Sequence, residues 1–349
     1  MLFRDSFVRS VVLVEPARAV TSLEIEARLA PVYDRLKLSP GRLELMTGIR
    51  ERRFWEPGTK PSAAAARAGE EAIRRSGVPR ERLGCLIHAS VSRDCLEPAT
   101  ASLVHEKLGL SGEAEIFDLS NACLGVLNGM AQAAAMIDSG RIEAALVVSG
   151  ETAEPLHEAT VAKLLADRRL SREGFKRQFA SLTIGSAAAA IVLTRGGGGL
   201  GPAPAHRLLG GAAGTDSRAN RLCREDPGEA TPAGPIMSTD SEGLLRAGCA
   251  LAARTWEKAK LALGWSNESP DHIFTHQVGK AHAKLTLETL GLPPARDFPT
   301  FPFLGNTGSA ALPGALAAGI RELDISPGAK LALLGIGSGL SCLMLGMEW

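Results

Sequence analysis

Three polar side chains occupy positions from which they could carry out acyl transfer. Cys123, in the segment FDLSNACLGVLNGM, lies between an expected strand and an expected helix, where the unpaired N–H groups at a helix start favour a thiolate nucleophile. His276 ends the apolar segment HIFTH, so its side chain would face the crevice at the carboxyl end of a strand. Asn306 lies between Gly305 and Gly308. Its amide could donate an uncharged hydrogen bond to a thioester oxygen that is becoming negative.

Each of these residues also has a structural interpretation. A cysteine is often a small buried hydrophobe, a histidine at a strand end can be held by hydrogen bonds, and an asparagine between glycines can form a turn. A fourth candidate is the segment GIGSGLSC (335–342), whose small residues follow an expected strand and let backbone N–H groups approach a ligand closely. This loop could hold a phosphate or form an oxyanion hole, but it does not open a helix as a dinucleotide-binding motif would.

Short apolar segments alternate with alanine-rich helical segments along the chain. The helical segments 62–77 and 124–140 each end at a glycine, as a C-cap would. This βαβα alternation predicts an α/β fold. The expected strands are 83–91, 115–121, 144–151, 187–195, 272–276 and 330–337, and two further helices are expected at 241–263 and 281–290.

The strand–loop–helix–strand unit around Cys123 is repeated around Asn306. The segment GGGGLGPAPAHR (196–207) has the composition of an exposed connector, and a polar, glycine-rich region (210–240) follows it. We therefore expect a duplicated fold with a site between the halves. Residues 1–195 would form the half with the cysteine, and residues 206–349 the half with the histidine and asparagine.

The composition excludes several classes of protein. The 349 residues include 39 Lys and Arg against 38 Asp and Glu, so no strong field favours nucleic acid or an anionic membrane. The six cysteines include no CxxC pair, which predicts reduced thiols and no zinc site. The N-terminus lacks the pattern of a signal peptide, and no long uninterrupted apolar stretch occurs. We expect a cytoplasmic protein without a membrane span that binds a small ligand.

Five segments, in order, resemble the β-ketoacyl synthase III type of condensing enzyme in the thiolase superfamily. They cover nearly the whole chain: TGIRERR (47–53), FDLSNACLG (117–125), THQVGKAH (275–282), GNTGSAALP (305–313) and LLGIGSGLSC (333–342). The resemblance implies a thiolase-like fold, with two duplicated βαβαβαββ halves in layers αβαβα.

The same resemblance implies roles for the candidate residues. Cys123, His276 and Asn306 would form the family's catalytic triad, with an acyl group carried on Cys123 as a thioester. Backbone N–H groups of Cys123 and of the loop at Gly337 and Ser338 would hold the oxyanion. His276 and Asn306 would bind the carbonyl oxygen of the second substrate. Coenzyme A thioesters are the expected substrates, and neither a metal nor another cofactor is expected.

The segment SRDCLEPATAS (92–102) places Glu97 where it resembles the bacterial OleA enzymes. In those enzymes a glutamate reaches the partner subunit's site and removes the α-proton of a second fatty acyl-CoA. The resemblance implies a homodimer that condenses two fatty acyl-CoAs without decarboxylation to a 2-alkyl-3-oxoalkanoic acid. This is the first step of long-chain olefin biosynthesis, so downstream pathway enzymes are expected partners. On the residue alone, a helix-start or surface carboxylate before Pro98 is the favoured interpretation of Glu97.

Other positions depart from the fatty-acid initiating enzymes. Arg42 and Met46 stand where those enzymes carry a Trp and an Arg that grip the coenzyme, and Gly279 stands where they carry an Asn. The coenzyme-contacting residues are therefore left unassigned. The alternatives are a 3-oxoacyl-acyl-carrier-protein synthase III that uses malonyl donors, a natural-product acyltransferase, and a scaffold that binds acyl chains without turnover.

Overall fold

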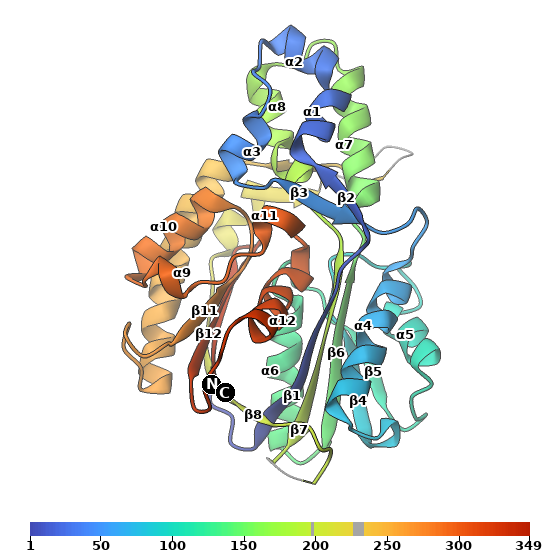
Figure 1. The fold of residues 1–349 in the computed structure, drawn as a ribbon, viewed down its shortest axis with the longest axis vertical. Helices are drawn as coiled ribbons and strands as arrows, with labels where there is room; N and C mark the ends of the chain where they lie inside the picture. The colour runs from blue at the N-terminus through green and yellow to red at the C-terminus, as the bar shows by residue number, and fades with distance from the viewer. Residues whose placement is uncertain (197–198, 226–233) are drawn as a thin grey trace.

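A nine-stranded sheet runs through the whole molecule in the computed structural model, which describes residues 1–196, 199–225 and 234–349 (Figure 1). The strand order is β11-β12-β13-β8-β1-β7-β6-β4-β5. The strands are β1 (Ser6–Val14), β4 (Leu83–His88), β5 (Glu115–Asp118), β6 (Ala144–Glu151), β7 (Ala187–Arg195), β8 (His206–Thr215), β11 (His272–Thr275), β12 (Lys330–Gly337) and β13 (Ser341–Glu348).

The two parts of the sheet repeat one pairing pattern. β1 pairs with β7 and β7 with β6, both antiparallel, and β6 pairs with β4 in parallel. In the same way β8 pairs with β13 and β13 with β12, both antiparallel, and β12 pairs with β11 in parallel. A short antiparallel contact between β1 and β8 joins the two parts. The predicted duplicated α/β fold is confirmed, while the exact division at residues 195 and 206 stays a prediction.

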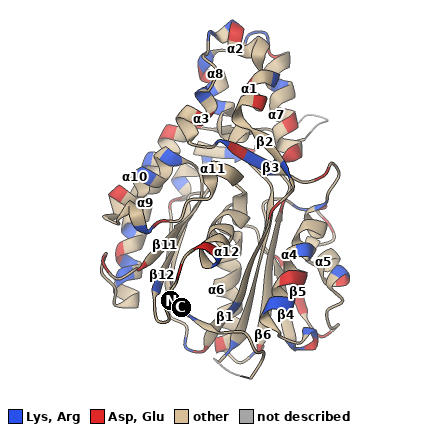
Figure 2. Cartoon of the chain, viewed as in Figure 1, with Lys and Arg blue, Asp and Glu red and all other residues tan. Residues whose placement is uncertain are grey.

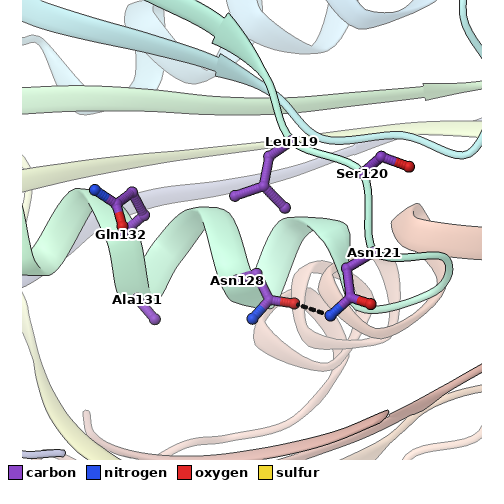
Figure 3. Close-up of a pocket in the computed structure, with 6 residues that line it drawn as sticks. All are labelled: Leu119, Ser120, Asn121, Asn128, Ala131 and Gln132. Carbon is purple, nitrogen blue, oxygen red and sulfur yellow. Dashed lines mark hydrogen bonds between the residues drawn. The ribbon is translucent and has the colours of Figure 1, made fainter. Parts of the chain in front are cut away.

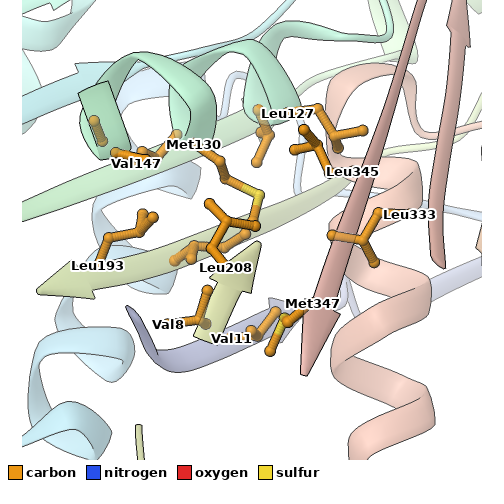
Figure 4. Close-up of a cluster of buried hydrophobic side chains, with 14 of the residues drawn as sticks. Val8, Val11, Leu127, Met130, Val147, Leu193, Leu208, Leu333, Leu345 and Met347 are labelled. Carbon is orange, nitrogen blue, oxygen red and sulfur yellow. The ribbon is translucent and has the colours of Figure 1, made fainter. Parts of the chain in front are cut away.

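Helices form three layers around this sheet. The central layer contains α6 (Gly125–Asp138) and α12 (Ala311–Glu322), which share one hydrophobic core with strands of both halves (Figure 1). Figure 4 shows this core, where Leu127 and Met130 of α6 lie near Leu345 and Val147 from opposite halves. The outer layers are α4 (Pro61–Ser76) with α5 (Thr100–Leu108) on one half, and α9 (Ser241–Leu263) with α10 (Lys280–Leu290) on the other.

Small residues explain how close the helices come to the sheet. Ala64, Ala65, Ala68 and Ala72 of α4 are fully buried, and a Cβ added at Gly150 of β6 would lie 2.2 Å from the carbonyl oxygen of Pro61. Only glycine permits this approach of helix to strand. The high alanine and glycine content is therefore a packing requirement of the layered fold.

A helical projection rises from one end of the sheet (Figure 1). It has its own core, which includes Ile25, Tyr33 and Phe175. None of its elements was predicted from the sequence. They are α1 (Ser22–Arg28), α2 (Ala30–Leu36), α3 (Arg42–Thr47), α7 (Glu154–Ala166) and α8 (Arg172–Gln178), with β2 (Arg18–Thr21) and β3 (Glu51–Phe54) at the base.

The prediction that residues 210–240 form only a polar region was wrong. The last two residues of the expected connector, His206 and Arg207, already belong to β8, which pairs with β13. At Gly211, φ is +155° and an added Cβ would lie 1.8 Å from the carbonyl oxygen of Met344. The close pairing of β8 with β13 requires glycine at this position. Because glycines replace apolar side chains in β8, its sequence lacks the apolar pattern by which a strand is recognised. Residues 197–198 of the connector, and residues 226–233 farther on, lie outside the described residues.

Positive and negative side chains are interspersed over the outer helices in Figure 2, as the balanced composition indicates. Within the described ranges, no helix combines the length and apolarity that crossing a bilayer requires. The described His, Cys, Asp and Glu side chains likewise form no group of three or more suited to a metal ion.

Candidate active site

Cys123 lies in the loop between β5 and α6. The preceding residue, Ala122, has a φ of +46°, an uncommon left-handed conformation for a residue with a Cβ. It turns the chain sharply just before the helix. A Cβ added at Gly337 would lie 3.5 Å from the backbone nitrogen of Cys123. The structure therefore places the end of β12, with the predicted oxyanion residue Gly337, against the amide of the candidate nucleophile.

The electrostatic expectation for Cys123 was wrong. The residue keeps some accessible surface, but desolvation raises the pKa of its thiol to about 12, and the negative charge of Glu151 acts in the same direction. Burial therefore outweighs the partial positive charge of the helix start. Without a substrate, Cys123 is a neutral thiol at physiological pH.

His276 follows β11 and is held by its backbone, which donates from N to the carbonyl oxygen of Leu334 at 3.0 Å. Its side chain is buried, and Nδ1 has no hydrogen-bond partner among the described residues. Desolvation, with a further contribution from His282, lowers the pKa of His276 to about 3. The imidazole is therefore neutral, and its one N–H can serve as an uncharged donor.

Asn306 is held by three hydrogen bonds, made by its backbone N, its backbone carbonyl and its side-chain Oδ1. Its N donates to the carbonyl oxygen of Thr183 at 3.0 Å, and its own carbonyl accepts from the N of Gly185 at 2.9 Å. The side-chain Oδ1 accepts from the N of Gly308 at 3.1 Å. With Oδ1 engaged, the Nδ2 group of Asn306 is the part of the amide left to donate to a ligand.

The loops of Cys123 and Asn306 meet through Ser309. The Ser309 Oγ accepts from the N of Val126, in the first turn of α6, at 2.9 Å. A Cβ added at Gly125 would lie 2.7 Å from the same oxygen. Two segments far apart in the sequence thus share one hydrogen bond beside the candidate nucleophile.

Sequence reasoning missed both Ser309 and Glu151. Glu151 ends the apolar strand AALVVSGE and is buried. A charged residue at the end of a buried strand is unusual and could have indicated a special role for Glu151. Its partners, however, are backbone N–H groups, which the sequence does not reveal.

Residues 117–206 match the family described as 3-oxoacyl-[acyl-carrier-protein (ACP)] synthase III, and residues 261–349 match its C-terminal part. The acyl-CoA:acyl-CoA alkyltransferases of Shewanella oneidensis and Xanthomonas campestris are each 38% identical to this chain, with 100% of both chains covered. The chain belongs to the acyl-CoA:acyl-CoA alkyltransferase (OleA) family. The predicted resemblance to OleA is confirmed.

Solved OleA structures agree with the family assignment. Crystal structures of Xanthomonas campestris OleA, including one bound to cerulenin, superpose with a TM-score of 0.93 at 37% identity and cover 100% of this chain and 98% of theirs. The β-ketoacyl-[acyl-carrier-protein] synthase III of Laribacter hongkongensis is a more distant relative, 30% identical over 84% of this chain and 86% of its own.

Within this OleA-family chain, Glu97 lies on the exposed loop between β4 and α5. In the described part of the chain, Glu97 makes no hydrogen bond or ion pair, and the adjacent Leu96 is 88% exposed. The structure therefore does not join Glu97 to Cys123, His276 or Asn306 of the same subunit by a hydrogen bond. Ser338 lies, half-buried, in the turn between β12 and β13.

A polar hollow of about 420 Å³ lies beside the nucleophile loop (Figure 3). Its lining includes Asn121, whose Nδ2 donates to Oδ1 of Asn128 at 2.7 Å. The other lining residues are Leu119, Ser120, Ala131 and Gln132. Leu119, Ser120 and Asn121 directly follow β5, and Asn128, Ala131 and Gln132 lie on α6.

The structure explains one departure from the fatty-acid initiating enzymes. Gly279 precedes α10 with a φ of +155°, and a Cβ there would lie 2.8 Å from the carbonyl oxygen of Thr47 at the end of α3. An asparagine would not fit at this contact. Arg42 and Met46 are exposed on α3, and nothing in the structure assigns them a coenzyme contact.

Proposed function

We propose that this protein joins two fatty acyl-CoAs by a Claisen condensation without decarboxylation, giving a 2-alkyl-3-oxoalkanoic acid. Full-length relatives named acyl-CoA:acyl-CoA alkyltransferases support the substrate class, as does a crystal structure of Xanthomonas campestris OleA with lauric acid and lauroyl-CoA. The observation that carries the proposal is an exposed, unpaired Glu97 on a chain that matches OleA throughout. A malonyl-dependent enzyme, which obtains its carbanion by loss of CO₂, needs no such base.

In the first half-reaction, the sulfur of Cys123 attacks the thioester carbon of one acyl-CoA. The thiol proton leaves as the carbon–sulfur bond forms, because the thiol is not ionised beforehand. Backbone N–H groups of Cys123 and of the Gly337–Ser338 loop hold the oxyanion. The bond to the coenzyme sulfur then breaks, and the coenzyme departs as a thiol that carries the proton.

In the second half-reaction, His276 and Asn306 donate hydrogen bonds to the carbonyl oxygen of the second acyl-CoA. Both donors are uncharged, and they stabilise the enolate that forms when Glu97 of the partner subunit accepts the α-proton. The α-carbon attacks the acyl carbon on Cys123, a carbon–carbon bond forms, and the bond to the Cys123 sulfur breaks; the sulfur leaves as a thiolate and regains a proton, which balances the one that Glu97 accepted. Hydrolysis of the remaining thioester consumes one water and releases the acid. No metal or other cofactor enters this scheme.

The crystal structures of Xanthomonas campestris OleA include variants that replace a cysteine, a glutamate or a histidine. In that chain the replaced glutamate precedes the replaced cysteine by the same number of residues as Glu97 precedes Cys123. This agreement supports the assignment of Glu97 and Cys123 to one site.

A homodimer is part of the proposal, because Glu97 does not contact its own site. Two features support it: the free edge of β5 at one end of the sheet, and the exposed apolar side chains of Val91 and Leu96 on the Glu97 loop. An unpaired strand edge presents N–H and C=O groups with which a second chain can pair. The cytoplasm, which supplies acyl-CoA, is the proposed location.

The test supplies myristoyl-CoA as the sole substrate to the purified protein. The proposal predicts release of coenzyme A together with a β-keto acid of two joined chains by mass spectrometry, and loss of that product in Glu97→Ala. A strict requirement for a malonyl thioester would contradict it and would favour the 3-oxoacyl-acyl-carrier-protein synthase III alternative.

A further inference from the structure

Glu151 is a buried carboxylate without a cationic partner. It is 4% exposed, and none of the described Lys or Arg side chains forms an ion pair with it. Its oxygens instead accept three backbone hydrogen bonds: Oε1 from the N of Val91 at 2.9 Å and the N of Ser309 at 3.0 Å, and Oε2 from the N of Ser92 at 3.0 Å. Such charge-assisted bonds are what allow a carboxylate to remain buried.

The three N–H donors belong to loops that carry proposed functional groups. Val91 and Ser92 begin the loop that leads to Glu97. Ser309 follows Asn306, and its hydroxyl binds the first turn of the helix after Cys123. Gly308, between Asn306 and Ser309 in the sequence, has a φ of +57°, and a Cβ there would lie 3.0 Å from Oε1 of Glu151. One carboxylate therefore ties together the Glu97 loop and the Asn306 loop, next to the nucleophile.

We infer that Glu151 is a positioning residue for the condensation step, which sets the Glu97 loop and the Asn306 loop in a fixed relation. The inference rests on the proposed function. It explains why a charged side chain is kept inside the fold, where its two oxygens accept hydrogen bonds from the backbone N–H groups of both loops.

The contacts predict which half-reaction depends on Glu151. Loading uses Cys123 and the oxyanion loop at Gly337 and Ser338, and no hydrogen bond joins Glu151 to either among the described residues. Condensation uses Asn306 and Glu97, and Glu151 holds the loops of both. Small misplacements of reacting groups are enough to slow a bond-forming step strongly.

The test compares Glu151→Gln with the wild type in both half-reactions. Glutamine keeps the size of the side chain, but its NH₂ group must face at least one backbone N–H, so a loop loses its acceptor. Acyl-Cys123 formation is followed by rapid quenching and intact mass, and condensation by yield of β-keto acid. We expect condensation to fall at least about tenfold while loading falls by no more than about threefold.

Two further variants sharpen the comparison. Glu154→Gln removes a nearby carboxylate that pairs with Arg18 at the surface and should leave both steps unchanged. Glu151→Asp keeps the charge but shortens the reach, so condensation should fall while the pH profile of Cys123 alkylation stays as in the wild type. In Glu151→Gln that profile should move to lower pH, because Glu151 and Cys223 are the two groups whose charge raises the pKa of Cys123.

Parallel losses of loading and condensation in Glu151→Gln would overturn the inference, since they would indicate a general structural role. Unchanged condensation would overturn it as well, and so would an alkylation profile that does not move. The wild type, assayed alongside, distinguishes failure of the proposed function from failure of the inference about Glu151. If it makes no β-keto acid, the proposed function fails, whereas active wild type with an equally active Glu151→Gln overturns the inference alone.

Discussion

Cys123 keeps some accessible surface, yet its surroundings disfavour the thiolate. Desolvation raises the pKa of the thiol to about 12, so only a very small fraction is ionised at neutral pH. A nucleophile of this kind reacts when a bound thioester and its oxyanion donors are in place, and resists small electrophiles otherwise. Gly337, a predicted oxyanion residue, lies against the backbone amide of Cys123, so oxyanion donors are already close to the sulfur before a thioester binds.

The rate of alkylation should show the low reactivity of the Cys123 thiol directly. We expect iodoacetamide to modify Cys123 slowly at pH 8 and faster as the pH rises toward the pKa of about 12. The exposed Cys95 provides an internal reference by peptide mass spectrometry. Rapid labelling of Cys123 near neutral pH would contradict the desolvated site.

Asp297 permits a test of stability at the residue scale. Its carboxylate accepts hydrogen bonds from the N and Oγ1 of Thr275, the residue before His276, while desolvation raises its pKa from 3.8 to about 6. The folded state therefore binds a proton between pH 4 and 6 that the unfolded state has lost, so this group lowers stability as pH rises through that window.

Asp297→Asn removes this titration and keeps an oxygen acceptor for Thr275. We expect the variant to gain roughly 1–3 kcal/mol relative to wild type between pH 4 and pH 7, measured by urea unfolding at both pH values. Histidines titrate alike in both proteins and cancel in the difference. An equal difference at both pH values would show that Asp297 titrates normally.

Residue types identified Cys123, His276 and Asn306 as candidates because thiol, imidazole and amide each have recognisable chemistry. Their proposed roles came from the resemblance to condensing enzymes. The raised pKa of Cys123 and the bonds of Glu151 could not be predicted, because both depend on atoms brought together only by the fold.

At the scale of elements, Gly305 and Asn306 form a tight junction with the segment before β7. Gly305 has a φ of +67°, and a Cβ there would lie 2.5 Å from the carbonyl oxygen of Thr183, which accepts the N of Asn306. A side chain at residue 305 must push the Asn306 loop away from this contact.

Gly305→Ala should therefore lower condensation by at least about tenfold and destabilise the fold by about 1–3 kcal/mol. Gly328→Ala is the matched control, because Gly328 also has positive φ, +81°, but has no atom within 4 Å of an added Cβ. It should cost about 1 kcal/mol without loss of activity. Equal effects of the two variants on condensation would refute a specific role for the Gly305 junction.

The sequence predicted several elements to the residue, including β6, β7, β12 and α9, because apolar runs and helical periodicity were strong there. It did not predict β8, whose glycines serve close pairing, or the helical projection, whose short helices pack mainly on one another. Apolar and helical patterns do not predict an element where its residues are determined by contacts with segments distant in the sequence.

At the scale of the whole molecule, the proposed chemistry requires two subunits. Light scattering should give twice the chain mass of 36.6 kDa. Leu96→Asp, which places a charge on the exposed apolar loop, should weaken the dimer and reduce condensation more than loading. A monomeric wild type with full condensation activity would exclude a base supplied by the partner.

In the proposed mechanism, Glu97 of one subunit removes the α-proton of the substrate bound beside Cys123 of the other subunit. Cys123→Ala and Glu97→Ala should each be inactive in condensation, so the two proteins are co-expressed with different tags and the mixed dimer is purified. One site of that dimer combines an intact Cys123 with the partner's intact Glu97. We predict that the mixed dimer recovers about half of the wild-type β-keto acid formation, whereas an inactive mixed dimer would contradict the account.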